Sequence, residues 1–212
     1  MSDAPLYCLP PSTEDTRSFI RAGALAMIAS PGQGNSIEDA YHRICFDNGV
    51  YTGRYPGDER YLAWLGKHRR HAERCLFAVA PDVVGNHFAT RTRSRDMLRR
   101  IRDLGLPVAY AAQNFMDLDA WDLWDEIDCL FIAGDDEWKL GPAAANLAAV
   151  ASSLGKWVHM GRVNSFSRFH YARLIGCDSV DGTHLTYAPD VSLAEILSWI
   201  RKSDLHTQAL SL

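Results

Sequence analysis

The stretch Gly155 to Thr183, GKWVHMGRVNSFSRFHYARLIGCDSVDGT, has the order strand, loop, helix, glycine, strand and acid. Trp157 to Met160 form an apolar-biased run of strand length. A helix can begin after Ser165, whose hydroxyl suits an N-cap, and end at the glycine that follows. A second short strand over residues 177–180 leads into Asp181, where α/β barrels keep catalytic groups. An Asp before a glycine also caps turns, so both interpretations stay open.

The rest of the chain repeats this alternation of strands and helices. Five further strands are predicted over residues 24–29, 43–46, 75–80, 108–112 and 129–133. Helices are predicted over residues 14–22, 36–39, 59–68, 91–104, 142–154 and 193–202, the last from a capping box at Ser192 and Glu195. The tail from Ser203 has no periodic pattern and is expected to be mobile.

Short apolar strands that alternate with helices predict a parallel sheet covered by helices. Seven strands are countable, and residues 184–187 offer an eighth. The count favours a compact TIM-like (β/α)8 barrel as a single domain over residues 1–212, with a doubly wound parallel sheet as the runner-up. In a barrel the carboxyl ends of the strands converge on one mouth. That mouth would gather Asp47, Asp82, Gln113, Gly134, Met160 and Asp181.

Composition is that of an ordinary globular protein, with 47% hydrophobic and 23% charged residues. The sequence has no apolar run near the ~18 residues of a membrane span, and it does not begin with a secretory signal pattern. Five scattered cysteines without a CxxC motif predict a reduced, cytoplasmic protein with no disulfide framework and no thiolate zinc site.

The net charge of −4 gives no reason to propose nucleic acid, but the charges are unevenly distributed. Ten of the 22 Lys and Arg residues lie between residues 67 and 102. Such a cluster can bind phosphates, and it can also be a solvated helix face.

The strand-end residues favour one kind of chemistry over others. Paired carboxylates suit glycosyl transfer, with one as nucleophile and one as acid or base. An Asp and a Gln at the same mouth suit the hydrogen-bonding edge of a purine. The sequence has no HExxH motif, no Walker lysine and no GxGxxG loop, so neither a metal nor a cofactor is expected.

The ordered strand-end motifs resemble the tRNA-guanine transglycosylase superfamily, specifically its small phage-type DNA-guanine transglycosylase branch. The resemblance covers about residues 24 to 190. It rests on Asp47-Asn48-Gly49-Val50-Tyr51, Ala80-Pro81-Asp82-Val83, Ala112-Gln113-Asn114, Ile132-Ala133-Gly134, His159-Met160-Gly161-Arg162-Val163 and Val180-Asp181-Gly182-Thr183. The sequence departs from the tRNA enzymes in having no Cys/His zinc site, and from the family's first motif at Val50.

The resemblance implies a role for each matched position. Asp181 would be the nucleophile that takes the sugar C1′, and Asp47 would be the general acid and base. Hydrogen bonds to the base edge would come from Asp82, Gln113 and the Gly134 backbone. Tyr51 and Met160 would sandwich the base, with Gly161 beside it.

The implied activity is a base exchange in DNA, in which a free 7-deazaguanine derivative replaces guanine. The compartment would be the cytoplasm of a bacterial cell or of a phage-infected host. For the DNA phosphates we expect contacts from Arg91 and Arg93, with Arg162 and Arg168 as further candidates. Two alternatives stay open: an N-glycosidase on the same barrel, and a non-catalytic barrel that binds nucleic acid or nucleosides.

Overall fold

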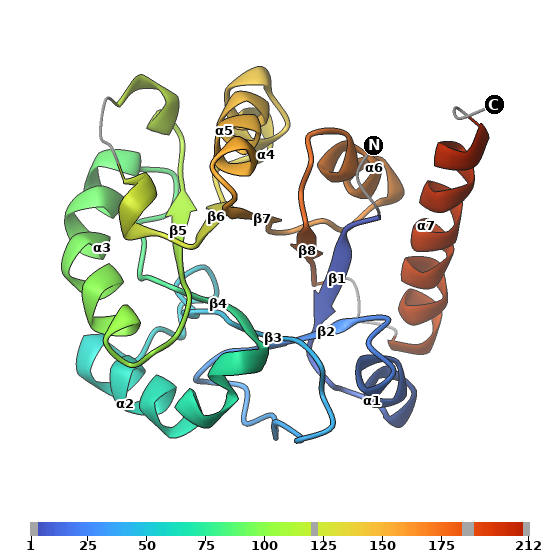
Figure 1. Cartoon of the computed structure of the whole chain (residues 1–212), viewed down its shortest axis with the longest axis horizontal. Coiled ribbons are helices and arrows are strands. Elements are labelled where there is room, and N and C mark those ends of the chain that lie inside the picture. The colour runs from blue at the N-terminus through green and yellow to red at the C-terminus, as the bar shows by residue number, and fades with distance from the viewer. Residues whose placement is uncertain (1–3, 120–122, 184–188, 210–212) are drawn as a thin grey trace.

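Eight parallel strands close into a barrel in chain order, with helices around the outside (Figure 1). The computed structural model describes residues 4–119, 123–183 and 189–209. The TIM-like barrel is therefore confirmed, and the open doubly wound sheet is excluded because β8 pairs with β1 to close the ring.

The strands are short, as the sequence predicts for a sheet that is buried on both faces. They are β1 (Leu6–Leu9), β2 (Ala26–Ala29), β3 (Ile44–Phe46), β4 (Cys75–Val79), β5 (Val108–Ala112), β6 (Cys129–Ile132), β7 (Trp157–Met160) and β8 (Ser179–Asp181). The helices are α1 (Glu14–Arg21), α2 (Asp58–His68), α3 (His87–Arg102), α4 (Asp136–Lys139), α5 (Pro142–Ser153), α6 (Phe166–Leu174) and α7 (Pro189–Ala209). Short 3-10 helices span Arg69–Arg74, Met116–Leu118 and Trp124–Glu126.

One strand in the first half of the chain was not predicted, and one helix predicted there is a loop. The strand that completes the barrel is β1, close to the N-terminus, whereas the eighth strand expected at residues 184–187 lies outside the described residues. Residues 36–39 are a loop rather than a helix, so β2 connects to β3 without a helix.

Two helix boundaries also differ, and local contacts explain the first. α3 begins at His87 rather than at residue 91 because Asn86 is its N-cap and accepts a hydrogen bond from the Ala89 N–H at 3.0 Å. α7 begins at Pro189, which places Ser192 inside the helix, and it continues to Ala209. The tail from Ser203, which was expected to be mobile, is therefore helical as far as Ala209. Ser165 caps α6 as predicted.

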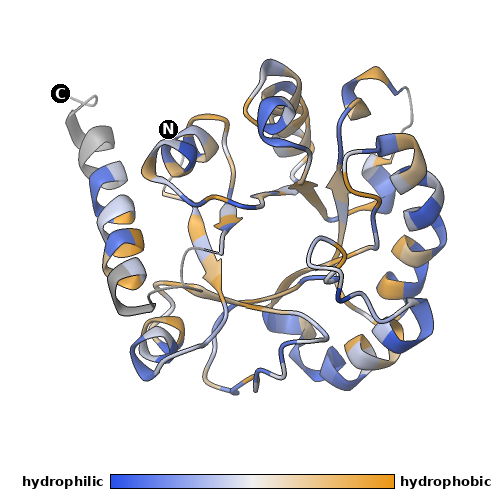
Figure 2. Cartoon of the chain, turned by 180° about the vertical axis from the view of Figure 1, so that it is seen from behind, coloured by the Kyte–Doolittle hydropathy of each residue, from blue (hydrophilic) through white to orange (hydrophobic). Residues whose placement is uncertain are grey.

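The alternation of side chains along each strand produces two apolar layers. Residues that point outward pack against the helices in one large core. Residues that point inward form a second, smaller core inside the barrel, which includes Cys8, Cys45, Phe77, Cys129 and Phe131. In Figure 2 the strands are largely coloured as hydrophobic, while α3 alternates hydrophilic and hydrophobic segments. All five cysteines are buried and free, which confirms the absence of a disulfide framework.

No described helix combines the length and the apolar character that a membrane crossing requires.

Glycine is required where β8 ends, and substitution there tests the barrel closure. A Cβ on Gly182 would lie 2.4 Å from the Tyr7 hydroxyl and 2.4 Å from Asn164 Oδ1. We expect Gly182→Ala to lower the free energy of unfolding by about 2 kcal/mol, because β1 and the β7–α6 loop must both shift. Gly66→Ala is the matched control in α2, where a Cβ meets nothing within 4 Å, and it should stabilise by about 0.5–1 kcal/mol. Urea denaturation measures both, and equal stability of Gly182→Ala and wild type would contradict the packing described here.

Candidate active site

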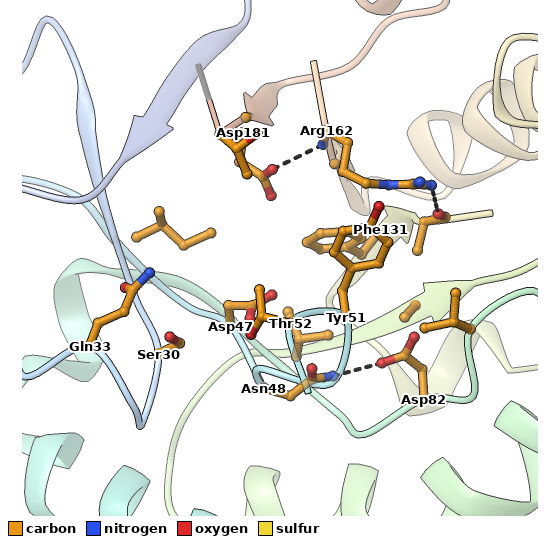
Figure 3. Close-up of a pocket in the computed structure, with 18 of the residues that line it drawn as sticks. Ser30, Gln33, Asp47, Asn48, Tyr51, Thr52, Asp82, Phe131, Arg162 and Asp181 are labelled. Carbon is orange, nitrogen blue, oxygen red and sulfur yellow. Dashed lines mark hydrogen bonds between the residues drawn. The ribbon is translucent and has the colours of Figure 1, made fainter. Parts of the chain in front are cut away.

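A pocket opens at the carboxyl-terminal mouth of the barrel, lined by residues at or after the ends of all eight strands. Most of the residues predicted at the mouth line it: Asp47, Tyr51, Asp82, Gln113, Gly161, Arg162 and Asp181. Gly134 and Met160 are not among the described residues that line it. Figure 3 shows Asp47 and Asp181 on opposite sides of the hollow.

Asp181 is held by one hydrogen bond to each carboxylate oxygen. His159 Nε2 lies 3.0 Å from Oδ2, and the Arg162 N–H donates to Oδ1 at 3.0 Å (Figure 3). Arg162 adopts a left-handed backbone with φ 60°, which turns its N–H toward Asp181. The preceding Gly161 is required because a Cβ there would lie 2.8 Å from the Phe131 ring.

His159 is the important site residue that the sequence analysis missed. It points into the barrel from β7 and is fully buried beneath the pocket. Burial by itself lowers the pKa of His159, but hydrogen bonds to Asp181 and Cys8 outweigh it and raise the pKa to about 9. The imidazole is therefore protonated at neutral pH and forms an ion pair with Asp181. The sequence carried no signal for it, because only the register of β7 with β6 and β8 shows which residues of β7 point inward.

Asp47 has a different environment from Asp181. Its Oδ1 accepts the Gly49 N–H at 2.7 Å, and no described cationic side chain forms an ion pair with it. Burial and, to a lesser extent, the nearby charge of Asp181 together raise the pKa of Asp47 to about 7. At neutral pH the pocket thus holds one carboxyl group that can donate a proton and one carboxylate that is paired with a cation.

Asp82 is the acceptor at the β4 side of the pocket. Asn48 Nδ2 donates to its Oδ1 at 2.9 Å, and Gln113 Nε2 donates to its Oδ2 at 2.7 Å. Gln113 Oε1 is occupied by the Gly85 N–H at 2.9 Å. Burial raises the pKa of Asp82. Gln113 therefore positions Asp82, and the sequence analysis missed Asn48, which directly follows Asp47.

Two aromatic side chains, Tyr51 and Phe131, form the walls of the pocket. Tyr51 is 59% exposed, and the Arg162 guanidinium lies 4.8 Å from its ring centre. Phe131 comes from β6 and stands close to Tyr51 in Figure 3. This side of the pocket is flat-walled and apolar, with Asp82 at its edge.

Met160 and Gly134 do not line the pocket. Met160 points outward from β7 and is fully buried in the core between the sheet and the helices, because its neighbour His159 points inward. The expectation that Met160 stacks on a base is therefore wrong. Gly134 follows β6 at the mouth, but its N–H donates to the Ala112 carbonyl at 3.0 Å, and its carbonyl accepts from the Arg162 guanidinium.

The arginines expected to bind phosphate are all engaged with carboxylates or carbonyls. Arg91 pairs with Asp119 at 3.0 Å, Arg93 with Asp58 at 3.2 Å and Arg168 with Asp136 at 2.5 Å. Arg162 contacts the carbonyls of residues 133 and 134. A phosphate that bound here would therefore have to contact arginines that already have partners within the protein.

Within the described part of the chain, no three His, Cys, Asp or Glu side chains gather as a metal site requires.

The comparisons with known proteins agree on the fold and do not define a family. No protein-family model matches the sequence, and no curated protein sequence gives a significant match. The chain is similar to a structure described as native KDPGal, with a TM-score of 0.58, 16% identity and coverage of 100% of this chain and 98% of the other. It is also similar to the tryptophan synthase a2b2 complex from Pyrococcus furiosus, with a TM-score of 0.53, 14% identity and coverage of 95% of this chain and 96% of the other. A mandelate oxidase mutant matches with a TM-score of 0.56, 15% identity and coverage of 87% of this chain and 64% of the other. At these identities the likeness shows the barrel alone, and none of the three is described as a transglycosylase.

The raised pKa of Asp47 predicts a pH-dependent effect of Asp47→Asn on stability. The unfolded pKa of Asp is about 3.9, whereas the folded pKa of Asp47 is about 7. The folded state thus keeps a proton that the unfolded state loses, and stability falls as the pH rises between these values. Asn does not ionise, so the variant should be more stable than wild type by about 1–2 kcal/mol at pH 8 and closely similar at pH 4. Urea denaturation at both pH values measures this, and a difference that does not depend on pH would contradict the raised pKa.

Proposed function

We propose that the protein is a pentosyltransferase that exchanges guanine in DNA for a 7-deazaguanine derivative. The observation that carries the proposal is the pair Asp47 and Asp181, which face the same pocket in different environments: burial raises the pKa of Asp47 to about 7, whereas Asp181 is paired with His159. Glycosyl transfer through a covalent intermediate needs one ionised nucleophile and one proton donor. The resemblance of the strand-end motifs supplies the substrate class.

The chemistry proceeds in two displacements. A carboxylate oxygen of Asp181 attacks the sugar C1′, the bond from C1′ to the base nitrogen breaks, and Asp47 donates its proton to the leaving base. The incoming base then loses a ring N–H proton to Asp47, and its nitrogen attacks C1′. The bond between C1′ and Asp181 breaks, which restores both carboxyl groups to their starting states.

The two sides of the pocket suit the two parts of a nucleoside. On one side of the carboxylates, Tyr51 and Phe131 offer apolar faces to a planar base, and Asp82 can accept its N–H groups (Figure 3). On the other side, Ser30 and Gln33 offer hydrogen bonds to the sugar. The glycosidic bond then lies between Asp47 and Asp181.

The rim of the pocket supports a strand of DNA as the substrate. Val84 lines the pocket and is 51% exposed, and Phe88, in the first turn of α3, and Phe115, in the loop after β5, are each 55% exposed. Exposed aromatic rings can stack on bases, and flipping a base into the pocket leaves its neighbours near the rim. Burial raises the pKa of Asp82, and Arg93, on α3, lies close enough for its charge to oppose that rise. Arg93 can therefore meet a phosphate near the mouth.

A second candidate is an N-glycosidase on the same site. The exposure of Tyr51 leaves the pocket open to water, and water in place of the incoming base would release the sugar from Asp181 and leave an abasic site.

Incubation with double-stranded DNA and labelled guanine separates these functions. Incorporation of label supports base exchange, abasic sites support the glycosidase, and bound but unaltered DNA contradicts both. Asp181→Asn should lower exchange by at least about 10³-fold while the protein stays folded, because the amide has no nucleophilic charge. Asp96→Asn is the matched control, since Asp96 lies on the exposed face of α3 outside the pocket. Wild-type turnover by Asp181→Asn would refute the nucleophile assignment.

Asp82 is expected to select the base. Asp82→Asn replaces two acceptor oxygens with one acceptor and one donor, which mismatches the N–H groups of a guanine edge. We expect the preference for guanine over hypoxanthine, which lacks the 2-amino group, to fall by roughly 10- to 100-fold. Competition between the two labelled bases measures this preference, and an unchanged ratio would make Asp82 purely structural.

A further inference from the structure

His159 lies outside the pocket lining, yet it belongs to a buried polar chain that ends at the pocket. Its ring is enclosed between Phe77 and Phe131, with ring centres 4.8 and 4.5 Å away. Both of its nitrogens have partners: Nε2 faces Asp181 at 3.0 Å, and Nδ1 faces Ser179 Oγ at 2.7 Å. The Trp157 indole N–H in turn donates to Ser179 Oγ at 2.8 Å. A histidine needed only for packing would not require this set of partners.

The donors and acceptors that link Trp157, Ser179, His159 and Asp181 largely fix where the hydrogens lie. An indole N–H only donates, so one lone pair of Ser179 Oγ is occupied. An ionised Asp181 only accepts, so His159 Nε2 must carry a hydrogen. When the imidazole is protonated, Nδ1–H donates to the second lone pair of Ser179. When it is neutral, the Ser179 hydroxyl donates to Nδ1. In both states Nε2–H points at Asp181.

We propose that His159 is a positioning residue, which holds the Asp181 carboxylate as the fixed anion of the pocket through the chain Trp157–Ser179–His159–Asp181. The inference rests on the proposed function for its kinetic consequence, but the chain of contacts exists independently of any substrate. Asp181 is held from below by His159 and from the β7–α6 loop by the Arg162 N–H. Its remaining lone pairs face the pocket, where Asp47 supplies the proton.

The other titratable groups around the imidazole are few. Cys8 on β1 contacts the ring, and its Sγ lies 3.5 Å from Cys45 Sγ on β3. Asp47 interacts with His159 electrostatically across the pocket, without a direct hydrogen bond between the two. Asp181 therefore supplies the carboxylate in direct contact with His159, and removing its charge should change the titration of the imidazole.

The first test is an NMR titration of His159, assigned by the loss of its signal in His159→Gln. In wild type we expect a pKa of about 9, as opposed to about 6.5 for an ordinary histidine. In Asp181→Asn the pKa should fall clearly below the wild-type value, because the hydrogen bond and the charge of Asp181 are lost and only Cys8 still opposes the effect of burial. A wild-type pKa at or below about 6.5, or no change in Asp181→Asn, overturns the ion pair.

The second test compares two substitutions of His159 in the exchange assay. Gln keeps an N–H donor for Asp181 but loses the charge, whereas Leu loses both. We expect kcat to fall about 10- to 100-fold in His159→Gln and at least about 10³-fold in His159→Leu, with KM for DNA within about twofold of wild type. Cys129→Ala is the matched control in the same interior core, since it opens space beside Trp157 but removes none of the side-chain hydrogen bonds that link Trp157, Ser179, His159 and Asp181. Equal activity of His159→Leu and wild type overturns the positioning role.

The two tests keep this inference separate from the proposed function. A high pKa that collapses in Asp181→Asn, together with no exchange on any DNA, would retain the ion pair and remove the transglycosylase. Exchange activity with an ordinary His159 pKa would retain the enzyme and remove the positioning role. Should His159→Leu not fold, the wild-type titration and the activity of His159→Gln still decide the matter.

Discussion

The ion pair between His159 and Asp181 is the interaction on which the local architecture depends. A buried charge is tolerated only when it is paired and hydrogen-bonded. Here each carboxylate oxygen of Asp181 has one donor, and those donors fix the loop after β7: Arg162 adopts a left-handed backbone, and Gly161 leaves room for Phe131. The same loop is held from behind by the fully buried Lys139, whose Nζ donates to the Gly161 carbonyl at 3.1 Å.

Burial raises the pKa of Asp47, and the negative charge of Asp181 adds to that effect. Asp47 comes from β3 on the opposite side of the pocket and has no cationic partner among the described side chains, so burial and the charge of Asp181 both favour its protonated form. Two chemically identical side chains thereby become a proton donor and an anion. The barrel provides this asymmetry because alternate inward positions on β7 and β8 place His159 beside one acid only.

Much of this arrangement could be predicted from the sequence because it follows from the ends of apolar strands. Asp47 and Gln113 directly follow a strand, Asp181 is the last residue of β8, and Asp82 lies three residues after β4. Parallel strands bring their carboxyl ends together, so these four side chains meet at one pocket. The sequence could not show in this way whether His159 or Met160 points into the barrel. β7 is apolar on both faces, so hydrophobicity does not tell which residues point inward, and the parity depends on the register with β6 and β8. β1 was not predicted because its four residues, which lie between two prolines, are too few to show a periodic pattern. Hydrogen bonds between distant segments, such as the one from Asn48 to Asp82, leave no pattern in the sequence.

We propose Asp181 as the nucleophile, held in place by His159 and by the Arg162 N–H. This role can be tested by covalent trapping, in which the protein is mixed with a guanine-containing duplex, quenched in denaturant within a turnover, and digested for mass spectrometry. We expect a fraction of the protein to be linked to DNA, with the sugar attached to the peptide that contains Asp181. A complete absence of linked protein while bases are being exchanged, or attachment at another residue, would contradict it.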